Sequence, residues 1–206
     1  MFLSRMALDV RKPETMKALI SPNLFHGAVE QAFPGERKRN LWRIDSLNGK
    51  RYILLLSVDQ PDYSHMIRQF GDEQESVEIK DYDNLLERIT NDGVWHFRLV
   101  ANPSRATIVA GRHRVVSHVT VEQQKKWMLD RAEKNGFTLD PDSFDVVWRT
   151  RYNFRKADHN RVQFSAAAFE GWLRVSDEER FKETLINGIG RERAYGMGLM
   201  TVVRGI

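Results

Sequence analysis

The chain has 206 residues, of which 41% are hydrophobic and 10% aromatic, and its 13 Gly and 6 Pro are too few for a low-complexity or collagen-like protein. It contains no cysteine, which excludes structural disulfides, Cys-ligated zinc, iron–sulfur clusters and thiol catalysis. The formal charge is +4, and the 32 Lys and Arg residues include local runs that fit a polyanionic partner.

The amino-terminal segment predicts a strand and no targeting signal. Residues 1–5 lack the apolar core of about 7–15 residues that a signal peptide needs. The longest aliphatic run, Ile53–Leu56, is too short to span a bilayer, so we expect a cytoplasmic protein without a membrane partner. Alternate positions from Phe2 to Val10 are mostly apolar, which predicts a strand that ends near Arg11–Pro13 and buries one face.

The rest of the first half predicts a helix, a hairpin, a second helix and a strand. Ser21–Pro22 supplies a helix cap followed by a proline at the first helical position. Asn48–Gly49 predicts a tight β-hairpin because both residues accept a positive φ. The predicted elements are a helix over 21–33, strands over 41–47 and 51–58, a helix near 64–70 and a strand over 94–100.

The second half predicts the same order of elements. Thr120 and Gln123 form a capping box for a helix that ends at Asn135–Gly136. Ser176 and Glu179 form another capping box, for a helix that ends near residue 187. Strand-like runs cover 144–155, 161–175 and 199–203.

Two successive βαββαβ halves predict an α+β protein with two tandem ferredoxin-like domains, each an antiparallel sheet with helices on one face. Asn102–Ser104 interrupts the strand pattern, and the basic stretch Arg105–Arg114 is interpreted as the connection between the halves. The predicted domains are therefore residues 1–103, which carry His26, and residues 104–206, which carry a basic hairpin and a glycine-rich loop.

Histidines are the natural candidates for acid–base chemistry, because only their unperturbed pKa lies between about 5 and 8. None of the six histidines is spaced as a pair for a helical metal site, so no metal is predicted. His26 lies one step off the apolar stripe of the first predicted helix, near the edge that a substrate could reach. A single helical histidine is also common as a surface or core residue, so both interpretations stay open.

Residues 188–198 contain four glycines and two arginines. Glycines let backbone N–H groups approach a phosphate, and the arginines could pair with the same oxygens. The glycines follow a helix and precede a strand, the reverse of the dinucleotide-binding order, so a nucleotide cofactor is disfavoured. A tight helix-to-strand connection explains the glycines equally well. The candidate RNA-binding residues of this loop are Gly188, Gly190, Arg191, Arg193, Gly196 and Gly198.

Cations also cluster on the predicted second hairpin, where Trp148, Tyr152 and Phe154 alternate with them. A basic two-stranded ribbon can lie in an RNA groove and neutralise phosphates. The alternative is an edge hairpin whose charges discourage aggregation. The further candidate RNA-binding residues are Arg37, Lys38, Arg39, Arg105, Arg149, Arg151, Arg155, Lys156 and Arg161.

Six short segments together carry a resemblance that spans the chain. They are Phe2–Arg5, His26–Pro34, Leu41–Arg43, Phe97–Pro103, Phe169–Gly171 and Gly188–Leu199. In their order and spacing the chain resembles the CasE family of CRISPR-associated endoribonucleases. The resemblance implies a double ferredoxin-like fold and cleavage of CRISPR repeat RNA at the 3′ base of its stem-loop. The RNA's own 2′-hydroxyl would attack, leaving a 2′,3′-cyclic phosphate and a 5′-hydroxyl, with no metal and no cofactor.

The resemblance also assigns residues and partners. It implies that His26 is a general acid or base, whereas Asn23 stands where family members often carry a tyrosine. Asn23 could hydrogen-bond the 2′-hydroxyl or a phosphate oxygen but cannot exchange a proton, so cations such as Arg37, Lys38 or Arg161 would stabilise the developing charge. The implied partners are CRISPR precursor RNA, the mature guide RNA and other subunits of a type I-E surveillance complex.

Two other functions are considered. A hairpin-binding assembly subunit that has lost cleavage is compatible with the missing tyrosine. A small-molecule enzyme is disfavoured, because no carboxylate pair or cofactor motif stands at a suitable position.

Overall fold

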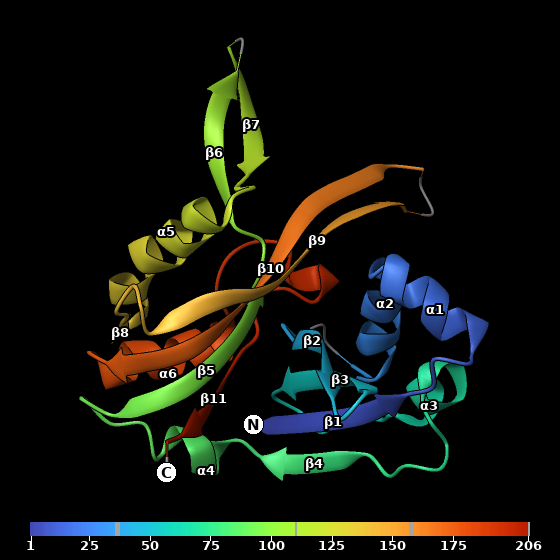
Figure 1. The fold of residues 1–206 in the computed structure, drawn as a ribbon. Helices are drawn as coiled ribbons and strands as arrows, with labels where there is room; N and C mark the ends of the chain where they lie inside the picture. The colour runs from blue at the N-terminus through green and yellow to red at the C-terminus, as the bar shows by residue number, and fades with distance from the viewer. Residues whose placement is uncertain (36–37, 110, 157–158, 206) are drawn as a thin grey trace.

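The computed structural model describes residues 1–35, 38–109, 111–156 and 159–205, and its strands form a four-stranded sheet, a five-stranded sheet and a separate two-stranded hairpin (Figure 1). The first half contains β1 (Phe2–Leu8), α1 (Pro13–Ile20), α2 (Asn23–Gln31), β2 (Leu41–Leu47), β3 (Lys50–Ser57), α3 (Ser64–Phe70), β4 (Glu78–Asp81) and α4 (Asp83–Leu86). The second half contains β5 (Val94–Ala101), β6 (Ser104–Val109), β7 (Arg112–Ser117), α5 (Val121–Ala132), η1 (Glu133–Asn135), β8 (Phe137–Thr138), β9 (Phe144–Arg155), β10 (Arg161–Val175), α6 (Glu178–Asn187), η2 (Arg193–Tyr195) and β11 (Met200–Arg204).

The first sheet has the strand order β2-β3-β1-β4, and every neighbouring pair is antiparallel. Residues of α1, α2 and α3 pack on one face of it, where Phe25 and Phe70 join Met6 and Ile53 in a common core. Alternate residues of β3 point the other way, so Leu56 joins the core of the second half instead. The central strand β3 therefore packs on both of its faces.

The second sheet places β5 between β11 and β10, with β9 and the short β8 both pairing with β10. Its main core joins Phe97 and Phe169 of the sheet to Trp127 of α5 and Phe181 of α6. Leu41 of the first sheet belongs to the same core. The two halves are thus joined by apolar packing as well as by the chain.

The strand over residues 94–101 belongs to the second sheet, which corrects its expected place in the first. It pairs on both sides, with β10 and with β11, and its apolar residues lie beneath α5 and α6. The fourth strand of the first sheet is β4, whose four residues are all exposed and which therefore lacks apolar alternation. Sheet membership changes between Asp81 and Val94, so we propose that the domains divide there and not after residue 103.

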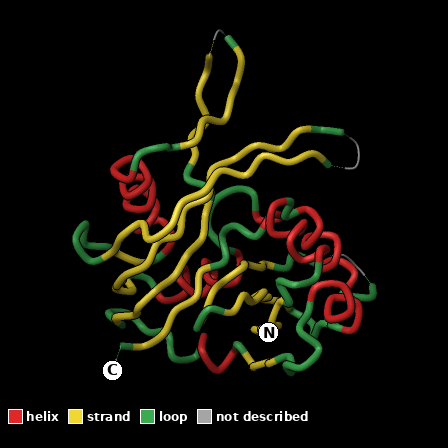
Figure 2. The backbone as a smooth tube through the Cα atoms, turned by 45° about the vertical axis from the view of Figure 1, so that its right-hand side comes forward, coloured by secondary structure: helices red, strands yellow, loops and turns green. Residues whose placement is uncertain are grey.

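The prediction that the basic stretch Arg105–Arg114 is a simple connection between the halves is wrong, because its described residues belong mostly to the paired strands β6 and β7. Strands β6 and β7 pair only with each other and project from the body in Figures 1 and 2. Val115 and Val116 of β7 are exposed, so the strand has no buried face to supply an alternation signal.

The local signals for helix starts are partly confirmed. The capping box of Thr120 with Gln123 is present. The second predicted capping box is wrong, because the carboxylate of Asp177, one residue after Ser176, accepts the Arg180 N–H and caps α6. The cap predicted at Ser21 is also wrong, because α2 begins after Pro22 without a side-chain cap, and α1 directly precedes it.

An extra residue in β9 divides that strand into two parts. Val146 pairs with Phe169 and Trp148 with Ala168, which leaves Val147 between them as a β-bulge. In a regular strand Val146 and Trp148 would share one face. Because of the bulge, Val146 packs toward the main core, whereas Trp148 lines a cavity on the opposite side of the sheet.

Arg43 of β2 is only 1% exposed, and its buried guanidinium group joins the two sheets. It donates hydrogen bonds to the carbonyl oxygens of Arg98 and Leu199 at 3.0 and 2.9 Å, and to Thr201 Oγ1 at 2.9 Å. It also pairs with Asp45 at 2.6 Å, and Asp45 accepts a further bond from Arg98 at 2.6 Å. Burial lowers the pKa of the Arg43 guanidinium, and the Asp45 carboxylate opposes that shift.

Candidate functional site

His26 lies near the start of α2, where that helix meets η2 of the second half. Its side chain is 26% exposed, and its Nδ1 lies 3.9 Å from Oε1 of Glu30, one helical turn later. Its ring meets the ring of Tyr195 edge-on, with 6.5 Å between centroids. The histidine is therefore partly accessible, and an acidic and an aromatic side chain limit its orientation.

Tyr195 connects His26 to the end of the β9–β10 hairpin. Its ring stacks on Phe164 at 5.7 Å and meets the ring of Phe154 edge-on at 5.3 Å. Lys156 Nζ lies 5.7 Å from the centroid of the same ring. His26, which can exchange a proton, and Lys156, which carries a positive charge, thus lie on either side of the buried Tyr195 ring.

Asn23 lies three residues before His26, as the sequence requires, and its side chain is half-buried. Its Oδ1 is buried and has no hydrogen-bond partner among the described residues. An unsatisfied buried acceptor costs about 1–3 kcal/mol, so this oxygen is suited to a donor from a bound molecule.

The glycine-rich loop packs tightly against the rest of the protein. A Cβ on Gly196 would lie 2.7 Å from the Trp42 ring, and one on Gly188 or Gly198 would lie 2.8 Å from a backbone carbonyl oxygen. Arg193 donates to the carbonyl oxygens of Gly188 and Gly190 at 3.0 and 3.1 Å. Packing accounts for these three glycines, so their contact with RNA stays a prediction, as it does for Gly190.

We expect Gly196→Ala to lower the free energy of unfolding by roughly 3 kcal/mol, through backbone strain at a positive φ and overlap with Trp42. Gly49→Ala is the matched control, because Gly49 has a φ of 78°, against 80° at Gly196, and no atom lies within 4 Å of the added Cβ. It should cost only about 1–2 kcal/mol. Urea unfolding of both variants measures the difference, and equal losses would contradict the packing role of Gly196.

The arginines of β9 lie on one side of the ribbon, as strand alternation requires. Arg149 and Arg151 line a groove of about 860 Å³ between β7, β9 and β10, which Arg114 also lines. Arg155 pairs directly opposite Arg161 across the hairpin. Like charges on facing residues repel one another unless an anion lies between them. The structure thus brings together Arg149 with Arg151 and Arg155 with Arg161, whereas Lys156 lies at the Tyr195 ring.

The other predicted cations lie in different places. Arg39 lies near Arg193, whose guanidinium pKa is lowered by burial and further by the Arg39 charge. Lys38 pairs with Asp59 at 2.7 Å, and Arg105 lies on β6. Arg191 forms an isolated bridge with Asn102. Arg37 lies outside the described residues.

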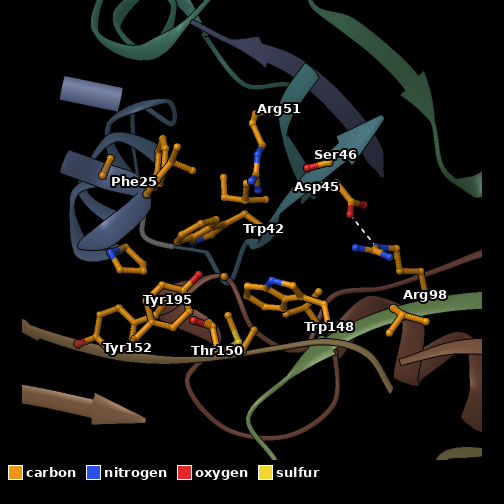
Figure 3. A pocket seen from close by; sticks show the side chains of 18 of the residues that line it. Phe25, Trp42, Asp45, Ser46, Arg51, Arg98, Trp148, Thr150, Tyr152 and Tyr195 are labelled. Carbon is orange, nitrogen blue, oxygen red and sulfur yellow. Dashed lines mark hydrogen bonds and ion pairs between the residues drawn. The ribbon is translucent and has the colours of Figure 1, made fainter. Parts of the chain in front are cut away.

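Sequence reasoning missed the cavity beside His26. About 550 Å³ in volume, it is lined by Trp42 and Arg51 of the first half and by Trp148 and Tyr195 of the second (Figure 3). These residues come from four separate elements, so no local motif marks them. The one available signal was the aromatic alternation on β9.

Two properties of the described residues bear on cofactors and membranes. Within ranges 1–35, 38–109, 111–156 and 159–205, no three His, Asp or Glu side chains gather in a way that could hold a metal ion. No helix in this part of the chain is long and apolar enough to cross a bilayer.

Comparison with known proteins gives consistent matches. A family model described as CRISPR associated protein matches residues 1–204. The chain is 28% identical over 220 residues to the CRISPR-associated endoribonuclease Cse3 of Thermus thermophilus, covering 98% of this chain and 99% of that protein.

Solved structures agree with these matches. Thermus thermophilus Cse3 bound to an RNA representing a pre-cleavage complex matches with a TM-score of 0.82 and 25% identity, over 98% of each chain. Cas6e from Escherichia coli K-12 matches with a TM-score of 0.62 and 17% identity, over 99% of this chain and 100% of that one. These matches confirm the predicted resemblance and the predicted α+β class with two tandem ferredoxin-like domains.

Proposed function

The chain belongs to the CRISPR associated protein family, and we propose that it is an endoribonuclease. We propose further that it binds CRISPR repeat stem-loops in precursor RNA and cleaves at the 3′ base of the stem. The observation that carries the proposal is the position of His26, which shares the Tyr195 ring with the cationic Lys156 at one end of an arginine-lined ribbon. A proton-transfer group thus lies close to the side chains that would hold the phosphate chain.

The proposed reaction uses a nucleophile that belongs to the RNA. The 2′-oxygen forms a bond to the adjacent phosphorus while the bond from phosphorus to the 5′-oxygen breaks. One proton leaves the 2′-hydroxyl and one reaches the 5′-oxygen, so the products are a 2′,3′-cyclic phosphate and a 5′-hydroxyl. His26 exchanges one of these protons, because imidazole is present in both protonation states near neutral pH. The proposed chemistry requires neither a metal nor a cofactor.

Neighbouring side chains complete the proposed site. The unpaired Oδ1 of Asn23 accepts a hydrogen bond from the 2′-hydroxyl and orients it. Lys156 places positive charge beside the nonbridging oxygens of the phosphate, where negative charge develops. Glu30 lies on the Nδ1 side of His26 and favours the orientation that leaves Nε2 toward the substrate.

The RNA stem would lie along the arginine side of β9. An A-form stem is recognised mainly through its phosphates and shape, which suits a row of exposed guanidinium groups. Arg155 and Arg161 face each other across the hairpin and would hold one phosphate between them. The remaining predicted cations and the glycine-rich loop stay candidates for contacts farther along the RNA.

Incubation of the protein with a labelled CRISPR repeat hairpin in excess EDTA tests the proposal. A single cut that leaves a cyclic phosphate and a 5′-hydroxyl is the expected result. Tight binding without a cut would instead support the second candidate, a non-cleaving hairpin-binding assembly subunit, which the presence of Asn23 in place of tyrosine favours. No binding to the hairpin would contradict both.

Arg151→Ala is expected to weaken hairpin binding roughly three- to tenfold and to reduce the slope of log K against log salt by about one unit, because one phosphate contact is lost. Arg180→Ala on α6 is the matched control, since its side chain is exposed and pairs with Asp177, the residue that caps that helix. Titrations at several salt concentrations measure both variants. An unchanged slope for Arg151→Ala would place the stem elsewhere.

We also propose that the protein acts in the cytoplasm, retains the mature guide RNA after cleavage and joins other subunits of a type I-E surveillance complex. Retention of the product predicts nearly single-turnover kinetics. A burst of product equal to the enzyme concentration, followed by little further turnover, is the expected time course with excess hairpin.

A further inference from the structure

A cavity of about 550 Å³ lies between the two halves, next to His26. Phe25, which precedes the histidine, lines it, and so does Tyr195, whose ring contacts the histidine ring. The side chains around it come from α1, α2, β2 and β3 on one side and from β5, β9, β10 and the η2 loop on the other (Figure 3). A ligand in this cavity would contact two neighbours of His26, Phe25 in the chain and Tyr195 in space.

Flat aromatic rings form much of the wall. Trp42 and Trp148 point into the same space from β2 and β9, and in Figure 3 Tyr195 lies below Trp42, with Tyr152 lower still. Trp42 is 1% exposed, whereas Trp148 is 44% exposed although it is a large apolar side chain. A planar ligand that stacks on Trp148 would remove this surface from water.

Polar groups at the same cavity are fixed in position. Trp42 Nε1–H is buried and has no hydrogen-bond partner among the described residues. Asp45 accepts three N–H bonds, two from Arg43 and one from Arg98. A carboxylate offers about four acceptor positions, so one remains for a ligand. The cavity therefore combines planar walls with a free acceptor at Asp45, and an unpaired N–H lies buried within the Trp42 wall.

We propose that this cavity receives one unpaired nucleobase of the bound RNA, adjacent to the phosphate on which His26 acts. A nucleobase has two flat faces that stack on aromatic rings and an edge that carries donors and acceptors. Bases within the stem are paired and cannot enter. The base of the stem adjoins unpaired nucleotides, so a base within reach is always present there. The inference rests on the proposed function. It gives the protein a way to recognise the identity of an unpaired nucleotide outside the stem.

The test compares the unmodified repeat hairpin with hairpins that carry one abasic site at each unpaired flanking position in turn. At one position the abasic site should weaken binding about tenfold, as expected for one lost base–aromatic stack. Trp148→Ala should bind the unmodified hairpin about as weakly as the wild type binds the abasic hairpin. An abasic site at that position should not weaken binding by Trp148→Ala any further. Trp42→Phe keeps a ring but removes the N–H, so it should reduce the preference among the four bases at that position.

Trp172→Ala is the matched control, because Trp172 is also 44% exposed but is absent from the lining of this cavity. It should behave as wild type at every position. A wild-type protein that neither binds nor cuts the unmodified hairpin would contradict the proposed function itself. A protein that binds and cuts it, yet is insensitive to every abasic site, would overturn only the nucleobase pocket. An abasic effect that persists in full in Trp148→Ala would also overturn it.

Discussion

His26→Ala is expected to lower the rate constant for hairpin cleavage by about 100- to 10,000-fold while changing the hairpin dissociation constant by less than about twofold. The loss has this size because alanine cannot exchange a proton with the 2′-hydroxyl or the 5′-oxygen. Binding persists because the phosphate contacts proposed for β9 do not involve the histidine. Single-turnover cleavage with enzyme in excess, beside a binding titration at the same salt concentration, measures the two quantities separately.

His65→Ala provides the control, because His65 is an exposed histidine on α3, outside the cavity and the groove. It should cleave at the wild-type rate. Cleavage undiminished in His26→Ala would remove this residue from the mechanism. A parallel loss of binding and cleavage would instead indicate that His26 holds the RNA and does not transfer a proton.

Arg43→Met is expected to lower the free energy of unfolding by about 3–5 kcal/mol, because it leaves a buried carboxylate without its main partner. Asp45, which is 15% exposed at its side chain, would keep only its bond to Arg98. The carbonyl oxygens of Arg98 and Leu199 would each lose the donor that connects the two sheets. Urea unfolding measures the loss, and a second transition would show that the halves have begun to unfold separately.

Arg11→Met is a matched control for this prediction. Arg11 also makes two hydrogen bonds to an aspartate two residues away, Asp9, but its side chain is 77% exposed. Exposed pairs contribute about 0–1 kcal/mol, so its loss should be small. Equal effects of the two substitutions would contradict the view that burial makes Arg43 essential to the contact between the sheets.

The features predicted correctly from sequence are those decided by neighbouring residues. The Asn48–Gly49 turn has φ values of 51° and 78°, as the residue types require. The Thr120 cap depends on atoms only three residues apart. By contrast, β4 is exposed along its length, so no apolar alternation marks it as a strand. The strand β5 was predicted, but its partners lie about 70 and 100 residues later in the chain, so no local signal identified them.

The site was predictable to the same limited extent. The resemblance selected His26, but its contact with Tyr195 joins residues that are far apart in sequence. Trp42 is a buried β-strand residue, and its sequence context gives no sign that its N–H lacks a partner. The glycines of the loop marked a constrained backbone correctly, but packing against Trp42 and Ile189 accounts for them as well as a phosphate would.

The bulge at Val147 affects how this chain should be aligned with its relatives. Along the sequence, Phe144, Val146 and Trp148 look like one apolar face, although the first two serve the main core and the third lines the cavity. A relative that lacks the extra residue would keep every side chain on its present face. An alignment gap belongs opposite Val147 in such a case. A gap placed at the hairpin turn would equate cavity residues with groove residues along the whole outer half of β9, and substitutions there would be assigned to the wrong surface.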